Sequence, residues 1–434
     1  MQHQPPTTVV VGAGLAGLTA AATAAAHTDG GARVTLLEAR THQGGRARTA
    51  RVDGFLLNQG AHALYRGGPA WATLTDFGIE PQGNAPDAST AKALRADGTL
   101  APLPASVGSL ATTSLLNARG KLQIARILAR TAHLADTVEP GTSLQQWIDG
   151  RSRDATVRAL LRLLLRTATY CDDLDRLDAA AGLRQLAQVV AHGVVYLDGG
   201  FQQLVDALQA VADARGVTTL TNAKVDAVDV VDGAFVVRTS HGDLDADAVV
   251  HAAGGPVDVD RVLHGVSAAV RGWAEREVPV CATALDLALR ALPDPNHRVV
   301  FGLDEPLYFS VHTPAARLVT DGHGEVAHLL WYGDRDDDPR PQLEGLLDRA
   351  QPGWRDEVVD VRYGRQLVVA HGRPLPGSGF AGRPPVAVPD VPGLFVAGDW
   401  AGAEGFLTDA VLASGRAAGR AAAQATTTNL RMSA

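Results

Sequence analysis

The sequence predicts an α/β protein, α+β overall, in which a unit built on a parallel sheet is interleaved with a mixed sheet-and-helix unit. Three observations predict this class. The chain opens with a strand, a glycine-rich turn and a helix; α/β patterns return near residue 198 and again near residue 393; and the stretches between them differ in character. Because 434 residues are about three times the usual size of one domain, we expect two domains that alternate along the chain.

The composition excludes several classes of protein. Hydrophobic residues make up 46% of the chain and charged residues 20%, which is typical of a folded globular protein. The formal charge of -8 disfavours nucleic acid as a partner, because such binding needs clustered cations. Two cysteines, Cys171 and Cys281, are too few for a disulfide framework or a structural zinc site, so no metal is expected. The first eight residues carry no signal-peptide pattern, and no apolar run reaches about 18 residues, so we expect a cytoplasmic protein that is at most peripheral to a membrane.

The first forty residues are predicted to form a βαβ unit. Residues 7–11 are a β-branched apolar run, and an Ala-rich helix follows to residue 26. The Asp-Gly-Gly of residues 29–31 is expected to end this helix, and residues 33–37 form the second strand.

Three glycines in the first turn indicate a dinucleotide. Gly12 permits the sharp turn, Gly14 lets the backbone approach a diphosphate, and Gly17 lets the helix pack closely on the strand. Glu38 ends the second strand 21 residues beyond Gly17, where a carboxylate can bind ribose hydroxyls and repel a 2′-phosphate. The weaker alternative is a purely structural glycine turn.

A second glycine cluster follows six residues after this acid. Gly44, Gly45 and Arg46 allow another backbone approach to a diphosphate with a guanidinium as counter-charge. A domain that binds only a nicotinamide dinucleotide would continue with further βα units at this point. We therefore infer a cofactor that extends further than a nicotinamide dinucleotide. A solvated loop is the alternative.

The remaining elements follow from periodicity and turn residues. Helical patterns at residues 122–134 and 157–165 indicate a helical insertion between about residues 66 and 198. Asp232-Gly233 predicts a hairpin turn, and residues 426–434 read as a loose tail. Other expected elements are helices at 201–214 and from about 408, and strands at 217–220, 225–231, 235–239, 248–252, 299–301, 307–311 and 328–332. A further strand is expected to begin at residue 394, before the loop that contains Gly398 and Asp399. We therefore expect one domain from residues 1–66, 198–265 and 372–434, and a second from 67–197 and 266–371.

These motifs resemble FAD-dependent oxidoreductases of the flavin amine oxidase and phytoene dehydrogenase-related superfamily. The resemblance rests on residues 9–17, on Glu38-Ala39-Arg40 with residues 44–49, and on residues 394–399, and it covers roughly half of the chain. It implies a Rossmann-like, discontinuous FAD-binding domain, a substrate-binding domain, and oxidation or desaturation of an organic substrate. Neither cysteine lies in the C-terminal flavin loop, so we expect non-covalent FAD. By the motifs and this resemblance, the residues expected to bind FAD are Gly12, Gly14, Leu15, Ala16, Gly17, Glu38, Ala39, Arg40, Gly44, Gly45, Arg46, Gly60, Ala61, His62, Val225, Gly398, Asp399, Gly405, Phe406 and Leu407.

Side chains near the reactive ring are harder to assign. In the family, the stretch matching Gly60-Ala61-His62 runs beside the flavin, so His62 is a candidate catalytic residue together with Tyr308 and Trp331. A buried structural role is the alternative for each. Further candidates are His312, Trp400 and Phe406. The N-terminal N–H groups of the helix after Leu407 can stabilise an anionic reduced flavin.

Two departures from the family bear on the substrate. No lysine follows Lys224, although many flavin amine oxidases hold a water at the flavin with a later lysine, and Ala403 stands where they place an aromatic residue. The expectation is hydride transfer from an apolar small molecule to flavin N5, phytoene-desaturase-like, with O₂ or a quinone as acceptor. The alternatives are an amine oxidase that releases peroxide and ammonia, a non-catalytic lipid or prenyl-binding protein, and a non-redox flavin mutase. Arg126 and Arg130 can form a basic face for membrane contact, with a solvated face as the alternative; the oligomeric state stays open.

Overall fold

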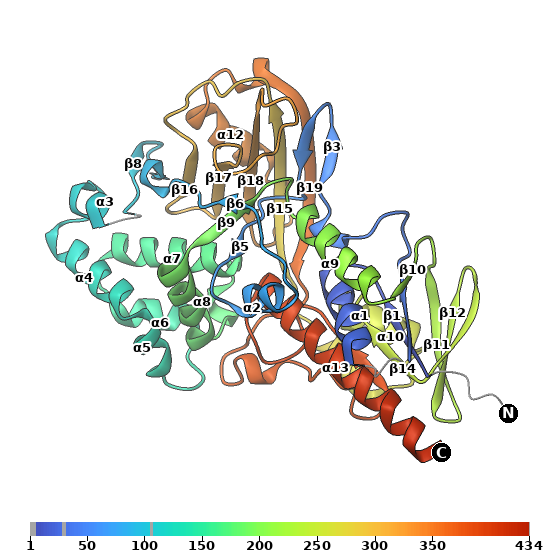
Figure 1. Ribbon diagram of the computed structural model, residues 1–434. Helices are drawn as coiled ribbons and strands as arrows, with labels where there is room; N and C mark the ends of the chain where they lie inside the picture. The colour runs from blue at the N-terminus through green and yellow to red at the C-terminus, as the bar shows by residue number, and fades with distance from the viewer. Residues whose placement is uncertain (1–5, 28–31, 105–106, 434) are drawn as a thin grey trace.

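The computed structural model describes residues 6–27, 32–104 and 107–433. It contains a parallel sheet, an antiparallel three-stranded sheet, a mixed seven-stranded sheet and a group of helices beside it (Figure 1). The fold class expected from the sequence is confirmed. The expected end of the first helix, at residues 29–31, lies outside the described residues.

The parallel sheet is assembled from distant parts of the chain. Its order is β10-β2-β1-β14-β20, with bounds Thr7–Val11 for β1, Arg33–Leu37 for β2, Thr218–Leu220 for β10, Ala248–His251 for β14 and Leu394–Val396 for β20. The central strands β1 and β14 are buried along nearly their whole length because both faces of the sheet are covered. On one face, α1 (Leu15–His27) and α13 (Leu407–Ser433) pack against the strands, while α9 (Gln202–Ala214) packs on α1 and α2 (Pro69–Asp76) packs on α13.

The other face of the parallel sheet is covered by a smaller sheet and two helices. The expected hairpin at Asp232-Gly233 is confirmed, since both residues have positive φ, 51° and 83°, and Val231 pairs with Ala234. These elements are β11 (Val225–Val231), β12 (Ala234–Thr239), β13 (Gly242–Ala246), α10 (Pro256–Val262) and α11 (Ala268–Glu275).

The seven-stranded sheet has the order β19-β15-β18-β17-β16-β7-β8 and one strand pair that is parallel, β16 with β7. Its strands are β7 (Lys92–Leu94), β8 (Leu100–Pro102), β15 (Val280–Leu289), β16 (Val299–Gly302), β17 (Leu307–Val311), β18 (Glu325–Tyr332) and β19 (Val358–Ala370). Helix α12 (Arg340–Ala350) packs on one face, and the helical group packs on the other. Short strands connect the units: β3 (Ala50–Val52), β4 (Phe55–Leu57), β5 (Leu64–Tyr65), β6 (Gly83–Asn84) and β9 (Val194–Leu197).

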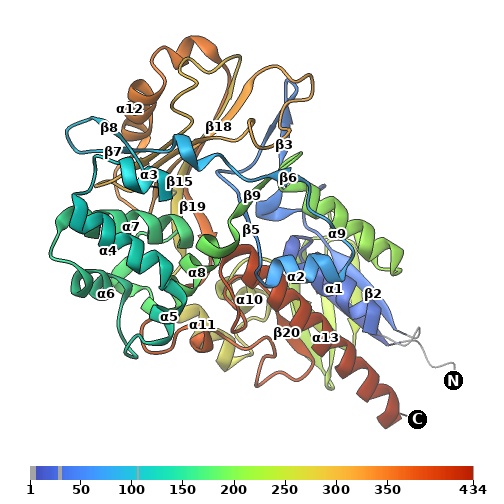
Figure 2. The same cartoon turned by 60° about the vertical axis from the view of Figure 1, so that its left-hand side comes forward.

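The helical insertion is confirmed, with one difference in its helices. The pattern at residues 122–134 is divided into α4 and α5 at Arg130, whose φ and ψ of -122° and 13° leave the helical region. The helices are α3 (Val107–Thr112), α4 (Ala118–Ala129), α5 (Thr131–Asp136), α6 (Leu144–Arg151), α7 (Ala155–Thr169) and α8 (Ala179–His192), and Figure 2 shows them as a group outside the parallel sheet. Single 3₁₀ turns lie at Gly45–Ala47, Ala88–Thr90, Leu174–Arg176, Trp354–Glu357 and Phe380–Gly382.

The expectation of a loose tail is wrong, because α13 continues to Ser433. This helix crosses α1 closely, since a Cβ on Gly415 would lie 2.5 Å from the carbonyl oxygen of Ala16 and one on Gly419 would lie 2.3 Å from that of Ala20. Glycine therefore sets the distance between the two helices.

No helix among the described residues is long and apolar enough to span a membrane. Arg126 and Arg130 are exposed on and just after α4, and membrane contact there remains a prediction. The strands of the two large sheets fall within the two expected sets of segments, while the domain boundaries themselves remain a prediction.

Candidate functional site

The motif residues gather at the carboxyl edge of the parallel sheet. Gly12 follows β1, Glu38 follows β2, and Asp399 lies just beyond β20. Neighbouring parallel strands end at one edge, which is where α/β proteins bind ligands. Segments far apart in the sequence therefore meet at this edge.

The first glycine turn depends on the absence of side chains. Gly12 has a φ of 97°, and a Cβ on Gly17 would lie 1.8 Å from the carbonyl oxygen of Gly12. A Cβ on Gly14 would meet nothing nearer than the carbonyl oxygen of Gly44, 3.9 Å away. Leu15 and Ala16 begin α1 and are buried. Gly12 and Gly17 are thus required by packing, whereas Gly14 leaves open space.

Glu38 is held at the edge by backbone groups. Its Oε2 accepts a hydrogen bond of 3.0 Å from Ala13 N, and its Oε1 accepts one of 2.9 Å from Arg40 N. Ala39 and Arg40 are exposed. Ala223 N donates to the Glu38 carbonyl at 2.8 Å, which brings Val225, two residues later, to the same end of the site.

The second glycine turn lies directly against the first. Gly44 N donates to Ala13 O at 2.8 Å, and a Cβ on Gly45 would lie 3.8 Å from Gly14 Cα. Gly44 and Gly45 have φ values of 114° and 54°, which suit glycine. Two stretches of bare backbone with the Arg46 side chain beside them form a surface that fits a diphosphate.

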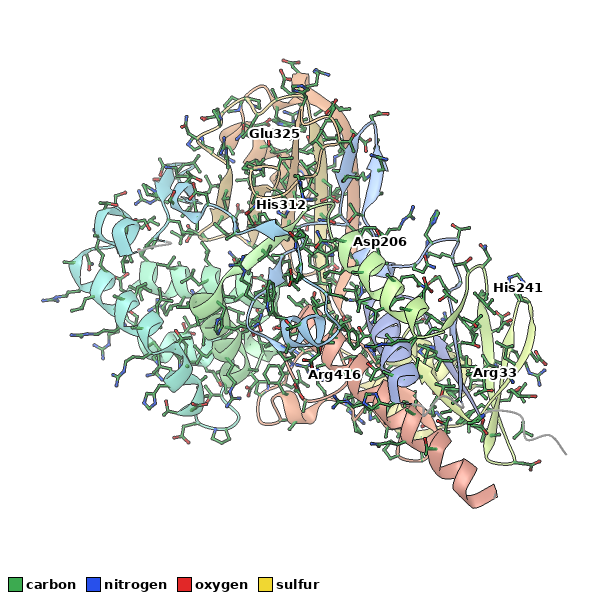
Figure 3. All side chains as sticks on the ribbon, viewed as in Figure 1. Arg33, Asp206, His241, His312, Glu325 and Arg416 are labelled. Atoms are coloured by element: carbon green, nitrogen blue, oxygen red, sulfur yellow. The ribbon has the colours of Figure 1, made fainter. Side chains whose placement is uncertain are left out.

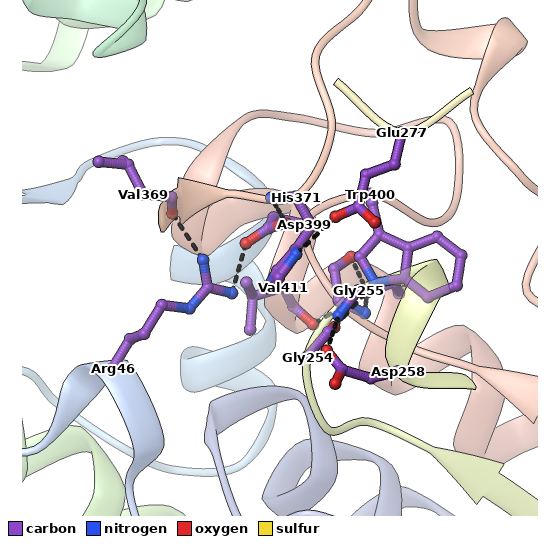
Figure 4. A network of polar contacts seen from close by, with 12 residues as sticks. Arg46, Gly254, Gly255, Asp258, Glu277, Val369, His371, Asp399, Trp400 and Val411 are labelled. Atoms are coloured by element: carbon purple, nitrogen blue, oxygen red, sulfur yellow. Dashed lines mark hydrogen bonds and ion pairs between the residues drawn. The ribbon is translucent and has the colours of Figure 1, made fainter. Parts of the chain in front are cut away.

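Arg46 links this turn to the C-terminal motif. Its Nη2 lies 2.6 Å from Asp399 Oδ2, and its Nη1 donates to Val369 O at 2.6 Å (Figure 4). The other oxygen of Asp399, Oδ1, accepts a hydrogen bond of 2.7 Å from His371 N. Asp399 is 3% exposed, so its charge is balanced within the site.

The loop after Asp399 leads into the N-terminus of α13. Gly405 and Leu407 have positive φ values of 65° and 50°, and Arg383 donates to Gly405 O. Gly398 is tied to α13 because Ser414 Oγ donates to Gly398 O at 2.8 Å.

The first turn of α13 contains a buried acid that the sequence reasoning missed. Asp409 accepts hydrogen bonds of 2.8 Å from Ala70 N and from Gln188 Nε2. Burial raises the pKa of Asp409, while these two hydrogen bonds act in the opposite direction. From the sequence we expected only the N–H groups, with their partial positive charge, at this end of the helix. The protonation state of the Asp409 carboxyl therefore changes the electrostatic potential at the N-terminus of α13.

The segment Gly60-Ala61-His62 is anchored through its backbone. Gly60 N donates to Asp286 Oδ2 at 3.0 Å, and the Tyr170 hydroxyl donates to Ala61 O at 3.1 Å. His62 Nδ1 lies 3.0 Å from Gly60 O, and burial lowers the pKa of the His62 imidazole. The imidazole is therefore neutral at neutral pH.

Tyrosines surround this segment. The Tyr196 and Tyr308 hydroxyls are 3.0 Å apart, and Tyr332 lies 5.8 Å from Tyr170 and 6.3 Å from Tyr308 between ring centroids. Burial raises the pKa of all four phenols. They stay protonated at neutral pH and act as hydrogen-bond donors. We call Tyr170, Tyr196, Tyr308 and Tyr332 the tyrosine cluster.

A buried histidine pair lies behind the tyrosine cluster. His312 stacks on Tyr196 at 3.7 Å and lies 4.5 Å from His328 between ring centroids, near the centre of the view in Figure 3. His328 Nδ1 is 2.7 Å from Asp286 Oδ1. The sequence reasoning missed Asp286 and His328, although a charged or polar residue inside a continuous apolar strand run could have drawn attention to them.

The structure does not bring every candidate into this group. Tyr308 and His312 lie here, whereas Trp331 points to the opposite face of the sheet, against Arg335, because side chains alternate along β18. Trp400 packs near Trp273 and donates to Gly254 O. Phe406 packs against Phe380 at 5.1 Å. We therefore no longer place Trp331 beside the flavin.

The comparisons with known proteins agree with this geometry. A family model described as flavin containing amine oxidoreductase matches residues 15–422. An oxidoreductase from Methanosarcina mazei superposes with a TM-score of 0.73 at 21% identity, over 95% of this chain and 99% of that one. A putative protoporphyrinogen oxidase from Exiguobacterium sp. 255-15 gives 0.67 at 19% identity, over 98% and 99%. Putrescine oxidase bound to putrescine gives 0.72 at 18% identity, over 95% and 99%. Likenesses at these identities concern the fold.

One relative is similar over a shorter stretch. Coproporphyrinogen III oxidase from Propionibacterium freudenreichii subsp. freudenreichii is 38% identical over 108 residues. That stretch is 25% of this chain and only 20% of the relative, so the match spans about a fifth of that protein's length. Since the family model covers nearly the whole sequence, the chain belongs to the flavin containing amine oxidoreductase family and is a FAD-dependent oxidoreductase.

Proposed function

We propose that this FAD-dependent oxidoreductase oxidises or desaturates an uncharged, hydrophobic small molecule bound between the Gly60–His62 segment and the tyrosine cluster. The chemistry that FAD supplies is acceptance of a hydride at flavin N5. The residues expected to hold FAD are those of the two glycine turns, Glu38, the Gly60–His62 segment, Val225 and the loop from Gly398 to Leu407. Gly12, Glu38 and Asp399 follow neighbouring parallel strands and so meet at one sheet edge, which supports this assignment.

The observation that carries the proposal is that, among the described residues, the carboxylates near the tyrosine cluster, Asp172, Asp286 and Asp409, already have partners; Asp172 is paired with Arg166 at 3.1 Å. Both oxygens of Asp286 are occupied, by Gly60 N and His328, and both oxygens of Asp409 are occupied, by Ala70 N and Gln188. A cationic ammonium would need a counter-charge in such a buried place. A Cβ on Gly60 would lie 3.5 Å from Ala284 Cβ and 3.6 Å from Leu330 Cδ2, so these two side chains add apolar wall beside this segment. These surroundings favour an uncharged substrate.

The side chains of this site are suited to positioning rather than to proton abstraction. Hydride transfer needs the reacting carbon held close to its acceptor, and this requirement does not include a general base. Tyr308, held by Tyr196, can orient a polar group of the substrate, and neutral His62 adds no charge. The buried aromatic walls exclude water from the reacting carbon.

The second candidate is oxidation of an amine, and family membership favours it. Putrescine oxidase and cyclohexylamine oxidase share the fold. The similarity to coproporphyrinogen III oxidase makes reduced cyclic tetrapyrroles a third kind of compound to include.

A single experiment separates these candidates. The purified enzyme is mixed anaerobically with a polyene hydrocarbon, a reduced porphyrinogen, or a primary or secondary amine, and loss of the oxidised-flavin absorbance is followed. We expect bleaching by an uncharged compound and no ammonia on readmission of air or a quinone. Bleaching by amines alone, with ammonia and peroxide released, would assign the enzyme to amine oxidation instead. Denaturation and filtration of the same sample should release free FAD, which checks non-covalent binding.

A further inference from the structure

A cavity of about 290 Å³ lies beside Asp399. It is lined by α11 and the residues after it, by the segment that follows β19, and by Trp400. In Figure 4, Arg46 and Trp400 lie on opposite sides of Asp399. None of the residues that line the cavity belongs to the two glycine turns or to the tyrosine cluster.

One part of the cavity wall is aromatic and apolar. Trp273 and Trp400 contribute two indole rings whose centroids are 6.2 Å apart, and Pro256, Pro384 and Pro385 complete the apolar part. Stacked and edge-on contacts with such rings favour a planar ligand.

The charged groups of the lining are mainly cationic. Three arginines, Arg276, Arg373 and Arg383, line the cavity with one carboxylate, that of Glu277. Glu277 Oε1 is 2.8 Å from His371 Nδ1, and Arg373 is paired with Asp173 at 2.9 Å. Both the single carboxylate and one of the arginines thus have partners already.

Arg383 differs, because its charge has no direct counter-ion. It is 8% exposed, and its guanidinium donates to two backbone carbonyl oxygens, those of Asp399 and Gly405, with no ion pair among the described residues. Burial lowers the pKa of Arg383 to about 10, and the nearby charge of Asp399 acts in the opposite direction. A buried cation without an ion pair is costly, and an anion in the cavity would offset that cost.

We propose that this cavity is a second binding site, separate from the catalytic one, for a small organic anion with a planar apolar body, of the aromatic carboxylate class. The carboxylate faces the arginines, as charge-assisted hydrogen bonding favours, and the planar body lies against the indole rings.

The cavity is also connected to the FAD side of the site. His371, in its lining, donates its N–H to Asp399 Oδ1, and Asp399 Oδ2 binds Arg46. An occupant that shifts His371 thereby changes the position of the Arg46 guanidinium. Binding should alter the absorption bands of bound FAD.

The test uses the FAD-loaded enzyme with benzoate as the probe and benzamide as its uncharged match. Tryptophan emission, excited where benzoate does not absorb, is titrated together with the flavin bands. We expect saturable quenching by benzoate and at least tenfold weaker binding of benzamide, because the amide lacks the charge. Arg276→Glu, at an exposed position, should weaken benzoate at least fivefold, and Trp273→Phe should remove most of the quenching.

The variant Tyr308→Phe shows whether benzoate binds in the cavity or at the tyrosine cluster. Unchanged benzoate affinity in this variant, with a loss in Arg276→Glu, supports the second site. Equal affinity for benzoate and benzamide, or a loss in Tyr308→Phe with none in Arg276→Glu, would overturn the proposal, the latter placing benzoate at the tyrosine cluster. Unchanged unfolding temperature and FAD content in each variant exclude misfolding as the cause.

Discussion

Gly14 and Gly17 of the first turn have different physical roles, and paired substitutions separate them. In Gly17→Ala the new Cβ would meet the Gly12 carbonyl oxygen at 1.8 Å, so α1 must move away from β1. We expect a loss of at least about 2 kcal/mol in unfolding free energy, as in overpacked cores. Gly14→Ala has open space, so its stability should stay within about 0.5 kcal/mol of the wild type, while the Cβ enters the space proposed for the diphosphate.

Urea unfolding of the FAD-free proteins and titration with FAD measure the two effects separately. Gly14→Ala should bind FAD at least tenfold more weakly with a nearly unchanged unfolding midpoint. A Gly14→Ala protein with normal FAD affinity would contradict the placement of the diphosphate against Gly14.

Arg46 offers a second comparison at the residue scale. Its guanidinium bridges Asp399 and Val369 O, whereas the exposed Arg48 has no side-chain partner among the described residues. Arg46→Gln should weaken FAD binding by roughly 10- to 100-fold, since it removes a charge-assisted contact worth about 1.5 to 3 kcal/mol. Arg48→Gln should leave FAD affinity within twofold. Similar losses in both variants would indicate a general charge effect instead of a specific contact.

At the element scale, the buried Asp286 joins two strands to the Gly60–His62 segment. Asp286→Ala leaves Gly60 N and His328 without their partner inside the sheet. Breaking such a buried pair costs about 3 to 5 kcal/mol. Asp360 on the neighbouring strand β19 is the control, because its pair with Arg362 is partly exposed and Asp360→Ala should cost less than about 1 kcal/mol. Equal urea midpoints for the two variants would show that the buried pair contributes no more than a surface pair.

The elements that could be predicted from sequence are those with a strong local pattern. The bounds of β1, β2 and β11 coincide with the ranges expected from their β-branched residues and turn signals, and the hairpin follows from Asp232-Gly233. The division of one helical pattern at Arg130 has no such signal, because Arg130 is neither a glycine nor a proline. The helical tail also escaped prediction, since threonines near its end are poor helix formers and packing on α1 is a tertiary effect.

At the scale of the whole molecule, the FAD motifs were readable because each needs bare backbone or a charge at a fixed spacing. The surroundings of the substrate could not be read from the sequence, because they depend on which strands become neighbours in the fold. Tyr196 and Tyr308 are 112 residues apart, and their hydroxyls meet only through the packing of β9 on the seven-stranded sheet. Side-chain alternation and register decide the face on which Trp331 lies, but the consecutive apolar residues from Leu329 to Tyr332 show no alternation that would reveal it.

The whole fold should lose stability in mild acid, and His251 at the end of β14 is one identifiable cause. Burial lowers the pKa of His251 to about 4, with a further lowering by Arg261 and an opposing effect of Asp258. The unfolded chain binds the proton near pH 6.5, so stability is complete above that pH and falls as the pH drops towards 4. From pH 7.5 to pH 5 the expected loss from this group is about 2 kcal/mol.

Urea unfolding of the wild type and of His251→Gln at both pH values measures this contribution. Burial also lowers the pKa values of His62 and His312, so the variant should keep part of the acid sensitivity. Between pH 7.5 and pH 5, the unfolding free energy of the variant should fall by about 2 kcal/mol less than that of the wild type. The comparison depends on this difference and is therefore independent of any constant cost of the substitution. If the two proteins lost equal stability between pH 7.5 and pH 5, His251 would have to be protonated or hydrated in the folded state, in conflict with its burial at the end of β14.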